Sequence, residues 1–239
     1  MQFLDLTLAT PAENLALDEA MLETIEAAER PCELLRIWES PQQAVIVGRS
    51  SSVAVEVNRP LCDERGIPIL RRCSGGATVV IGPGCLMYGV ILSYELRPHL
   101  QMLEQAHRHV MQTLIKAIQP LVPNVRFEGT CDLTLDGRKC SGNSLRCKRT
   151  HLLYHGTLLY DFPLDEIGQL LGTPPRQPEY RAGRSHQDFV ANLPTTAAAL
   201  RAALPQVWQA NEPLSDWPQA FTQQLAQERY SQDSWNFRL

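Results

Sequence analysis

The sequence predicts one large mixed domain of strands and helices, of the α/β or α+β class. Short apolar runs bounded by Gly, Pro and Ser recur along the chain, as expected of strands. Helical periodicity precedes and interrupts these runs, which indicates helices before and between the strands. The length of 239 residues and the 44% hydrophobic composition are typical of a globular domain that buries a substantial core.

The first half of the chain is predicted to contain two helices and five strands. Residues 11–28 place Leu17, Met21 and Ile25 near one stripe, which indicates an amphipathic helix. A second, short helix ends at Gly66. Strands are expected at residues 34–38, 44–47, 67–70, 77–81 and 86–93, with Ser-Pro, Ser-Gly-Gly and Gly-Pro-Gly segments among the breaks between them.

The second half opens with the most regular helix, residues 100–118, in which Leu103, Val110 and Leu114 repeat at helical spacing. Strands follow at 125–127, 131–135 and 152–160, and then a helix at 164–171. Residues 173–194 are rich in Pro, Arg and Gln and are expected to form an ordered arm over the domain. The main domain is therefore predicted to cover residues 1–194, and residues 195–239 to form a short helical extension.

Composition and charge exclude several classes of protein. A net charge of -4 disfavours a dedicated nucleic-acid binder, and no apolar run approaches the roughly 18 residues of a membrane span. Met1 opens onto no signal peptide, so the seven cysteines are expected to be reduced thiols in a cytoplasmic protein. Since no C-x-x-C pair occurs, no metal site is expected.

The segment R-R-C-S-G-G-A, residues 71–77, is the first candidate for a ligand site. Adjacent strand residues point to opposite faces, so Arg71 and Arg72 cannot both face one pocket. One could bind an anionic ligand while the other pairs with an acidic neighbour. Gly75 and Gly76 allow backbone amides to approach a ligand closely, although an ordinary Gly-rich turn with solvated arginines is equally compatible with the segment.

The segment D-G-R-K-C-S-G-N-S, residues 136–144, is the second candidate. Asp-Gly is a strong turn signal, and it places Lys139 just inside the next strand, before a small Ser-Gly-Asn segment. A lysine at that point could neutralise developing charge at an acyl or phosphoryl centre. A solvated edge lysine is the more common state of such a residue.

A third candidate is L-L-Y-H-G-T-L-L-Y, residues 152–160. His155 and Gly156 interrupt an otherwise apolar strand. Glycine within a strand often marks a place where another group approaches the backbone. A histidine in a strand is more often a hydrogen-bonded core residue than a catalytic base, so both roles stay open for His155.

The order and company of these segments resemble the lipoate–protein ligase A family, within the superfamily that also holds lipoyl/octanoyl transferases and biotin–protein ligases. The matching segments are P-A-E-N-L-A-L-D-E-A (11–20), L-R-I-W (35–38), V-I-V-G-R (45–49), R-R-C-S-G-G-A (71–77), D-G-R-K-C-S-G-N-S (136–144) and H-G-T-L-L (155–159). They span roughly residues 10–195. The resemblance implies an α+β fold, with a mixed, largely antiparallel sheet flanked by helices, for a catalytic domain at residues 1–194.

The resemblance also implies roles for individual residues. The segment at residues 71–77, called the arginine turn from here on, would close over the acyl carboxylate and the adenylate. Lys139 would contact the carbonyl and phosphate oxygens as the catalytic cation. The substrate-binding residues implied are Arg71, Arg72, Ser74, Gly75, Gly76, Ala77, Ser141, Gly142, Asn143, His155 and Gly156. Ala77 stands where the family has a third turn glycine.

The favoured reaction is that of a ligase, which uses ATP and Mg²⁺ to attach a lipoyl or octanoyl group, through an acyl-adenylate, to a lysine of lipoyl-domain proteins. Such proteins include 2-oxoacid dehydrogenase E2 subunits and the glycine cleavage H protein. Only a short extension follows the arm, where larger ligases carry an accessory domain, so help with adenylation from elsewhere stays open.

A cofactor-free alternative is transfer of octanoyl from acyl carrier protein through a cysteine thioester. Cys73, Cys131 and Cys140 lie in or beside the motifs. Cys131 is the strongest candidate because ligases often carry Asn at that position. A non-catalytic acyl-binding protein is a further alternative, disfavoured by the presence of Lys139 and the Ser-Gly-Gly turn.

Overall fold

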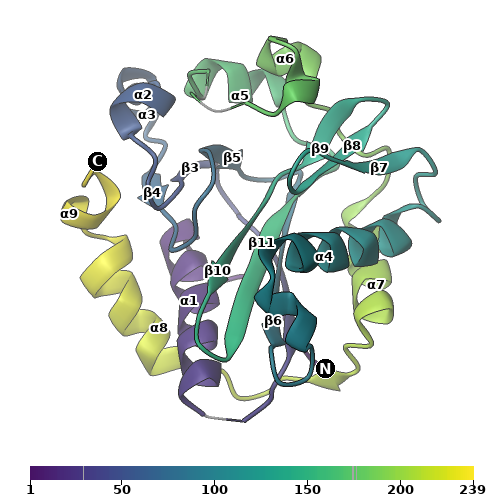
Figure 1. The fold of residues 1–239 in the computed structure, drawn as a ribbon. Helices are drawn as coiled ribbons and strands as arrows, with labels where there is room; N and C mark the ends of the chain where they lie inside the picture. The colour runs from purple at the N-terminus through teal and green to yellow at the C-terminus, as the bar shows by residue number, and fades with distance from the viewer. Residues whose placement is uncertain (29, 174, 176) are drawn as a thin grey trace.

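The computed structural model describes residues 1–28, 30–173, 175 and 177–239, and it is built around a six-stranded sheet (Figure 1). The strand order is β10 (Asn143–Cys147), β11 (His151–Leu159), β6 (Cys85–Ser93), β2 (Leu34–Glu39), β1 (Gln2–Asp5) and β12 (Glu212–Pro213). The first four strands pair antiparallel, whereas β2, β1 and β12 pair parallel. The predicted α+β class with a mixed, largely antiparallel sheet is confirmed.

Two three-stranded sheets flank the main sheet, and they carry Arg71 and Lys139. One has the order β4 (Ile69–Arg71), β3 (Ala44–Val47), β5 (Val79–Ile81), and the other is a meander of β7 (Val125–Glu128), β8 (Asp132–Leu135) and β9 (Arg138–Ser141). The turn from β8 to β9 has φ of 50° at Asp136 and 72° at Gly137. Two successive positive φ angles are what a two-residue hairpin requires, and Asp-Gly supplies them. The predicted turn before Lys139 is confirmed.

Strand alternation divides the core into two faces. On one face, Leu34, Ile91 and Leu153 pack against α1 (Pro11–Ala27). Their chain neighbours on the same strands pack on the opposite face against α4 (Leu103–Ile118), so the sheet lies between the two helices (Figure 1). Each face is apolar because successive strand residues point in opposite directions.

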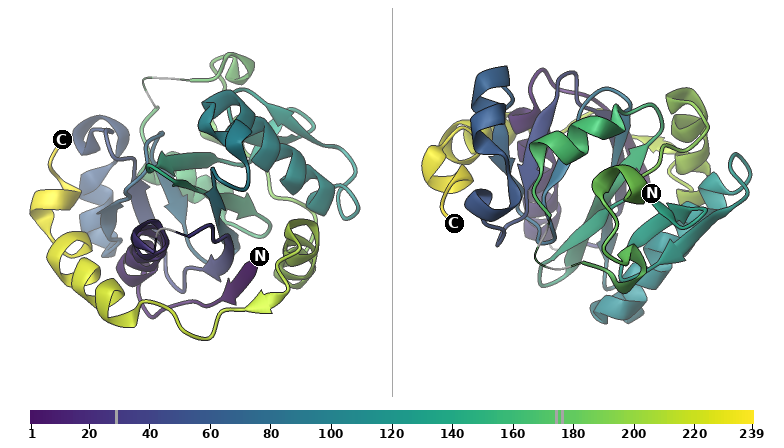
Figure 2. Two further views of the ribbon diagram at one scale, coloured as in Figure 1. Left: turned by 60° about the horizontal axis from the view of Figure 1, so that its bottom comes forward. Right: turned by 90° about the horizontal axis from the view of Figure 1, so that it is seen from above.

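The remaining helices cover the edges of this sandwich. They are α2 (Val53–Glu56), α3 (Arg59–Arg65), α5 (Leu164–Leu170), α6 (His186–Phe189), α7 (Ala197–Trp208), α8 (Gln219–Leu225) and α9 (Asp233–Asn236), with 3-10 turns at Pro98–Gln101 and Glu179–Arg181 and a π-helical turn at Ala226–Tyr230. α7 packs on α4, and α8 packs on α1, so the C-terminal segment wraps around the sheet (Figure 2). None of the described helices is long and apolar enough to cross a membrane.

Most predicted elements are confirmed to within two residues, and the differences have local causes. The helix predicted at 100–118 begins at Leu103, because Pro98 starts a separate 3-10 turn before it. The sequence did not predict β1, β10, β12, α2, α6 or α9, most of which are four residues long or shorter. The boundary proposed between residues 194 and 195 stays a prediction, although β12 beyond it pairs with β1.

Candidate active site

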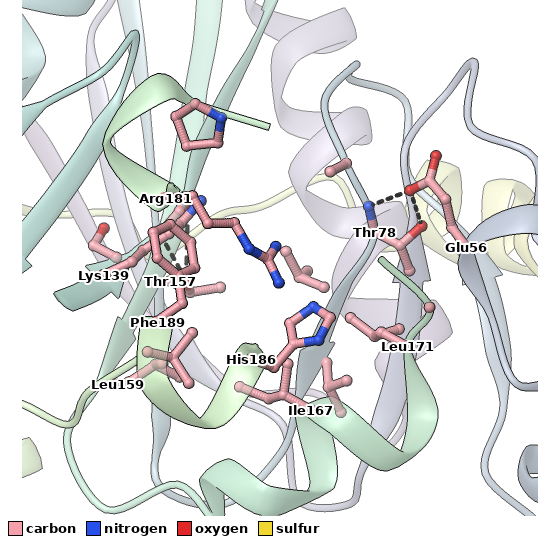
Figure 3. Close-up of a pocket in the computed structure, with 18 residues that line it drawn as sticks. Glu56, Thr78, Lys139, Thr157, Leu159, Ile167, Leu171, Arg181, His186 and Phe189 are labelled. Atoms are coloured by element: carbon pink, nitrogen blue, oxygen red, sulfur yellow. Dashed lines mark hydrogen bonds between the residues drawn. The ribbon is translucent and has the colours of Figure 1, made fainter. Parts of the chain in front are cut away.

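Two adjoining cavities open between the sheets, with empty volumes of about 800 and 590 Å³ that include the solvent space at their mouths. The larger lies under the arm and α5 (Figure 3), and the smaller lies beneath the arginine turn. Their shared wall consists of Ala77, Thr78, Val79, Lys139, Gly142 and Thr157. A group in this wall can contact the occupants of both cavities.

Lys139 enters the shared wall from β9, at the position that the Asp-Gly turn fixes. Its Nζ lies 2.7 Å from Oδ1 of Asp132 on β8, and its side chain is 27% exposed. The other carboxylate oxygen of Asp132 accepts a 2.7 Å hydrogen bond from the hydroxyl of Tyr180 in the arm. The carboxylate that holds the ammonium group is therefore itself fixed before any ligand binds.

The two arginines of the turn point in opposite directions, as predicted. Arg72 faces the smaller cavity and donates to the carbonyls of Ile46 (3.1 Å) and Ala77 (2.9 Å), and burial lowers its pKa to about 10. A pKa of about 10 still leaves the guanidinium charged at neutral pH. The side of the turn that faces the smaller cavity is therefore cationic.

Arg71 is fully buried on the far side of the turn, outside the described walls of both cavities. Its guanidinium donates to the carbonyls of Gly48 (2.7 Å), Ser51 (2.7 Å) and Asn236 (3.0 Å). Among the described residues, the acceptors that this side chain meets are backbone carbonyls, so Arg71 anchors the turn. The expectation that it contacts the ligand is corrected, because strand alternation sends its side chain away from the cavities.

The glycines of the turn permit close backbone contacts. Gly76 has φ of +86°, and a Cβ there would lie 3.0 Å from Nη2 of Arg72. Gly48 passes directly beneath, since a Cβ on it would lie 1.8 Å from the Gly76 carbonyl oxygen. The Gly75 carbonyl accepts a 2.9 Å bond from Ser144 on β10, which ties the turn to the main sheet. The importance of Gly48 was missed, although it ends the V-I-V-G motif.

The second and third motifs meet where β10 pairs with β11. Gly156 lies opposite Asn143, and a Cβ on Gly156 would lie 1.9 Å from the Asn143 side-chain oxygen. Ser141 lines the larger cavity, Gly142 lines both, and Asn143, His155 and Gly156 line the smaller. The structure thus brings the predicted residues of both motifs together at the cavities, with Asn143 filling the space that Gly156 leaves.

The family model for the lipoyl protein ligase A/B catalytic domain matches residues 10–207. The chain belongs to this family. The match includes the arginine turn, Lys139 and the arm, so it covers the described cavity walls.

Relatives of both reaction types are similar to this ligase A/B family member. The lipoate-protein ligase LplJ of Bacillus subtilis is 24% identical over 241 residues, covering 95% of this chain and 70% of the relative. The octanoyltransferase LipM of Halalkalibacterium halodurans is 25% identical over 274 residues, covering 99% of this chain and 98% of the relative. Against three further lipoate–protein ligases, the chain spans 42–53% of their length.

Solved structures confirm the fold of this ligase A/B family member. A structure of an archaeal lipoylation system from Thermoplasma acidophilum, a bipartite lipoate protein ligase and its E2 lipoyl domain, matches with a TM-score of 0.82 and 20% identity over 99% of this chain and 95% of that one. A lipoate-protein ligase A bound with ATP matches with a TM-score of 0.80 and 19% identity over 99% of each chain.

The contacts and burial of Cys131 are those of a packing residue. Its Sγ donates a 3.0 Å hydrogen bond to the Asn143 carbonyl, and neither described cavity wall includes it. Burial, with a smaller effect from Asp132, raises the pKa of Cys131 to about 11, and the opposing effect of Lys139 is weaker. The lysine therefore does not produce a thiolate there. Burial also raises the pKa of Cys73 and that of Cys140.

Several lining residues were missed by the sequence analysis. Arg181, His186 and Phe189 reach the larger cavity from the arm, where Arg181 lies 4.8 Å from the Phe189 ring (Figure 3). Glu56 lines it from α2 and accepts bonds of 2.9 and 2.8 Å from the amide and hydroxyl of Thr78. The arm's Arg-rich composition was noticed, but it did not indicate which side chains turn inward. Within the described ranges, no group of three or more His, Cys, Asp or Glu side chains could hold a metal ion.

Proposed function

We propose that this chain is a cytoplasmic enzyme that attaches a lipoyl or octanoyl group to a lysine of lipoyl-domain proteins through an acyl-adenylate. The observation that carries the proposal is the position of Lys139 in the wall that the two adjoining cavities share. A reaction that joins a fatty acid to a nucleotide brings two ligands together, and a cation between them can offset the charge that develops.

The smaller cavity suits a medium-chain acyl group. Leu15, Ile46 and Met87 give it apolar walls, while Arg72 and His155 add polar ones. Burial of an octanoyl chain would contribute about 0.8 kcal/mol per CH₂ group, or roughly 5 kcal/mol in all. The Arg72 guanidinium provides the charge that would orient the carboxylate at the end of that chain.

The larger cavity suits ATP, which supplies the adenylyl group. Lys139 and Arg181 would hold phosphate oxygens, and the ring of Phe189 offers an apolar surface for the base. Among the described wall residues, Glu56 is the acidic side chain, and one or two carboxylates with phosphate oxygens are the usual ligands of Mg²⁺ at such sites. The fold shared with a lipoate-protein ligase A bound with ATP supports this assignment.

Lys139 would act in both chemical steps. In the first step, a carboxylate oxygen of the acyl acid attacks the α-phosphorus of ATP, and pyrophosphate leaves. In the second, the acceptor lysine amine attacks the acyl carbonyl, AMP leaves, and the nitrogen loses a proton. Negative charge develops at the oxygens between the cavities in both steps, where the ammonium group held by Asp132 can offset it without reorganisation.

An octanoyl transfer from acyl carrier protein is the second candidate. The near-complete coverage of the Halalkalibacterium octanoyltransferase favours it, since the match includes 98% of that enzyme. The raised pKa of Cys131 and its position outside the described walls speak against a thioester at that thiol. We therefore place the ligase reaction first.

Acylation of an apo lipoyl domain from an E2 subunit or an H protein tests the proposal. Lipoate with ATP and Mg²⁺ is compared with octanoyl-acyl carrier protein alone, and the product is followed by mass spectrometry. Modification that requires ATP supports the ligase, and modification by octanoyl-acyl carrier protein without ATP establishes the transferase. Binding of the acyl acid with no modification under either condition would show a non-catalytic acyl-binding protein. A lipoyl domain with its acceptor lysine replaced by arginine is the control.

A further inference from the structure

Four buried side chains form a polar chain that leads from β2 to the arginine turn. Nη1 of Arg36 lies 2.5 Å from Oδ1 of Asp18 on α1, and Oδ2 of Asp18 lies 3.9 Å from Nδ1 of His155 on β11. Nε2 of His155 lies 2.5 Å from Oγ of Ser74 in the turn. The four residues are between 1% and 6% exposed. Buried polar groups of this kind are costly unless they are paired, so the chain is a specific arrangement.

The hydrogen-bond partners limit where the protons of Ser74 and His155 can lie. Ser74 Oγ accepts a 3.1 Å bond from Nε of Arg72, so its own proton is free to be donated to Nε2 of His155. The carboxylate of Asp18 faces the other ring nitrogen, Nδ1. When Nε2 accepts the serine hydroxyl, the ring carries a proton on Nδ1, the nitrogen that faces Asp18.

The far end of the chain is rigid. Arg36 also donates to the Asn14 carbonyl (2.8 Å), to the Asn14 side-chain oxygen (2.6 Å) and to the Leu6 carbonyl (2.9 Å). Burial alone would raise the pKa of Asp18, but the charge of Arg36 and the His155 contact outweigh it and hold that pKa below its usual value. An ionised Asp18 fixed on α1 is thus available to orient the histidine ring.

We propose that His155 and Ser74 are positioning residues that lock the arginine turn in the shape that receives the acyl carboxylate, with Asp18 and Arg36 acting through His155. This inference rests on the proposed function of the smaller cavity. Ser74 accepts from Nε of Arg72, which also donates to the Gly75 carbonyl. Nη2 of the same guanidinium bonds the Gly75 and Ala77 carbonyls of the turn, and Nη1 bonds the Ile46 carbonyl on β3. Loss of the serine contact removes the side-chain link between the Arg72 guanidinium and His155, and leaves the turn held by the backbone acceptors of Arg72 alone on that side.

The order Asp, His, Ser is also that of a serine acyl-transfer triad, but the geometry assigns Ser74 a holding role. Its side chain is 1% exposed and lies behind the described wall of the smaller cavity. Its oxygen already accepts a hydrogen bond from the Arg72 cation, which withdraws electron density from a would-be nucleophile. A nucleophile would need access to the acyl carbonyl, and Ser74 has none in this arrangement.

Three variants and one control test the lock. Ser74→Ala and His155→Leu remove it, whereas His155→Gln keeps an acceptor oxygen for the serine proton. We expect the first two to raise the KM for octanoate or lipoate at least tenfold and leave the KM for the lipoyl domain unchanged. His155→Gln should recover most of the loss. His151→Gln is the matched control, because His151 is a buried histidine of the same strand that contacts Glu26 outside both cavities.

A purely structural role would lower the fraction of active enzyme and leave KM unchanged, and that result would overturn the inference. An acyl ester on Ser74, detected by mass spectrometry of the wild-type protein after turnover, would also overturn it. If the wild type acylates nothing, the proposed function fails, and amide hydrogen exchange of residues 72–78 without substrate still tests the lock. Faster exchange in Ser74→Ala and His155→Leu, but not in His155→Gln, supports the lock. Equal exchange in the wild type and these three variants refutes it.

Discussion

Replacement of Lys139 by alanine should separate catalysis from folding. The change removes one ammonium group that lies 2.7 Å from Asp132, with 27% of the lysine side chain exposed. The stability lost is that of one partly exposed ion pair, at most about 1 kcal/mol, because Asp132 keeps its hydrogen bond from Tyr180. In a protein of this size, about 1 kcal/mol lowers the melting temperature by roughly 2–4 °C.

The expected loss of activity is much larger. Lys139 lies in the wall shared by both cavities, so in the proposed reaction its charge would act on the transition state of each chemical step. Removal of one preorganised charge contact costs roughly 3–4 kcal/mol of transition-state stabilisation. That is about two to three decades in rate.

The assay is the initial rate of acylation of an apo lipoyl domain at saturating lipoate and ATP, together with thermal unfolding of each variant. Lys148→Ala is the matched control, since Nζ of Lys148 lies 2.7 Å from Glu23 and the two side chains are 23% and 30% exposed. It should cost similar stability and little activity. Near-normal turnover of Lys139→Ala, or an equal loss in Lys148→Ala, would refute the role given to Lys139.

Three further changes test the surroundings of the site. Gly76→Val should weaken binding of a non-hydrolysable acyl-adenylate analogue at least tenfold in calorimetry, because Gly76 has φ of +86° and a Cβ there would lie 3.0 Å from Arg72. Unchanged affinity would exclude the turn as the ligand-binding segment. Cys131→Ser should keep most lipoate- and ATP-dependent activity, and an octanoyl adduct on the wild-type thiol would contradict the packing role. Burial raises the pKa of Cys131 from 9.0 to about 11, so alkylation of this thiol in the folded protein should stay slow at pH 8 and accelerate toward pH 11. Because the unfolded chain loses the thiol proton at the lower pH, the free energy of unfolding should fall over the same rise in pH. Asn236→Ala removes 2.9 Å bonds from the Arg71 amide and to the Tyr230 carbonyl, and should destabilise the protein by about 1–3 kcal/mol in thermal unfolding, whereas an unchanged melting temperature would show that the C-terminal segment does not anchor the turn.

Features set by local rules were predictable from the sequence. The Asp-Gly pair requires two positive φ angles, which fixed the start of β9 and hence the place of Lys139. The two-residue period of a strand predicted that Arg71 and Arg72 point in opposite directions, without any knowledge of their partners. Gly66 ends α3 with φ of 65°, as its position after the helix indicated. Each of these conclusions depends on a few adjacent residues.

Features set by contacts between distant segments were not predictable. Tyr180 meets Asp132 across 48 positions, and the Arg71 guanidinium finds the Asn236 carbonyl across 165. No periodicity or turn signal carries such pairings, so the anchoring role of Arg71 was missed. The surroundings of Cys131 have the same origin. Its place beside the motifs left a reactive thiol open, whereas its pKa depends on burial that only the folded chain creates.

Arg71 and Arg72 fix the turn from opposite sides. The C-terminal segment holds the Arg71 side, where the Trp235 indole donates a 2.8 Å hydrogen bond to the Arg71 carbonyl and the Asn236 side chain accepts one from the Arg71 amide. The chain through His155 and Ser74 grips the Arg72 side from α1 and the main sheet. A glycine-rich turn held at both ends keeps its backbone freedom only where the ligand must approach. The cation that we propose as the partner of the acyl carboxylate would then be in place before binding, so little of the binding energy would be lost in ordering it.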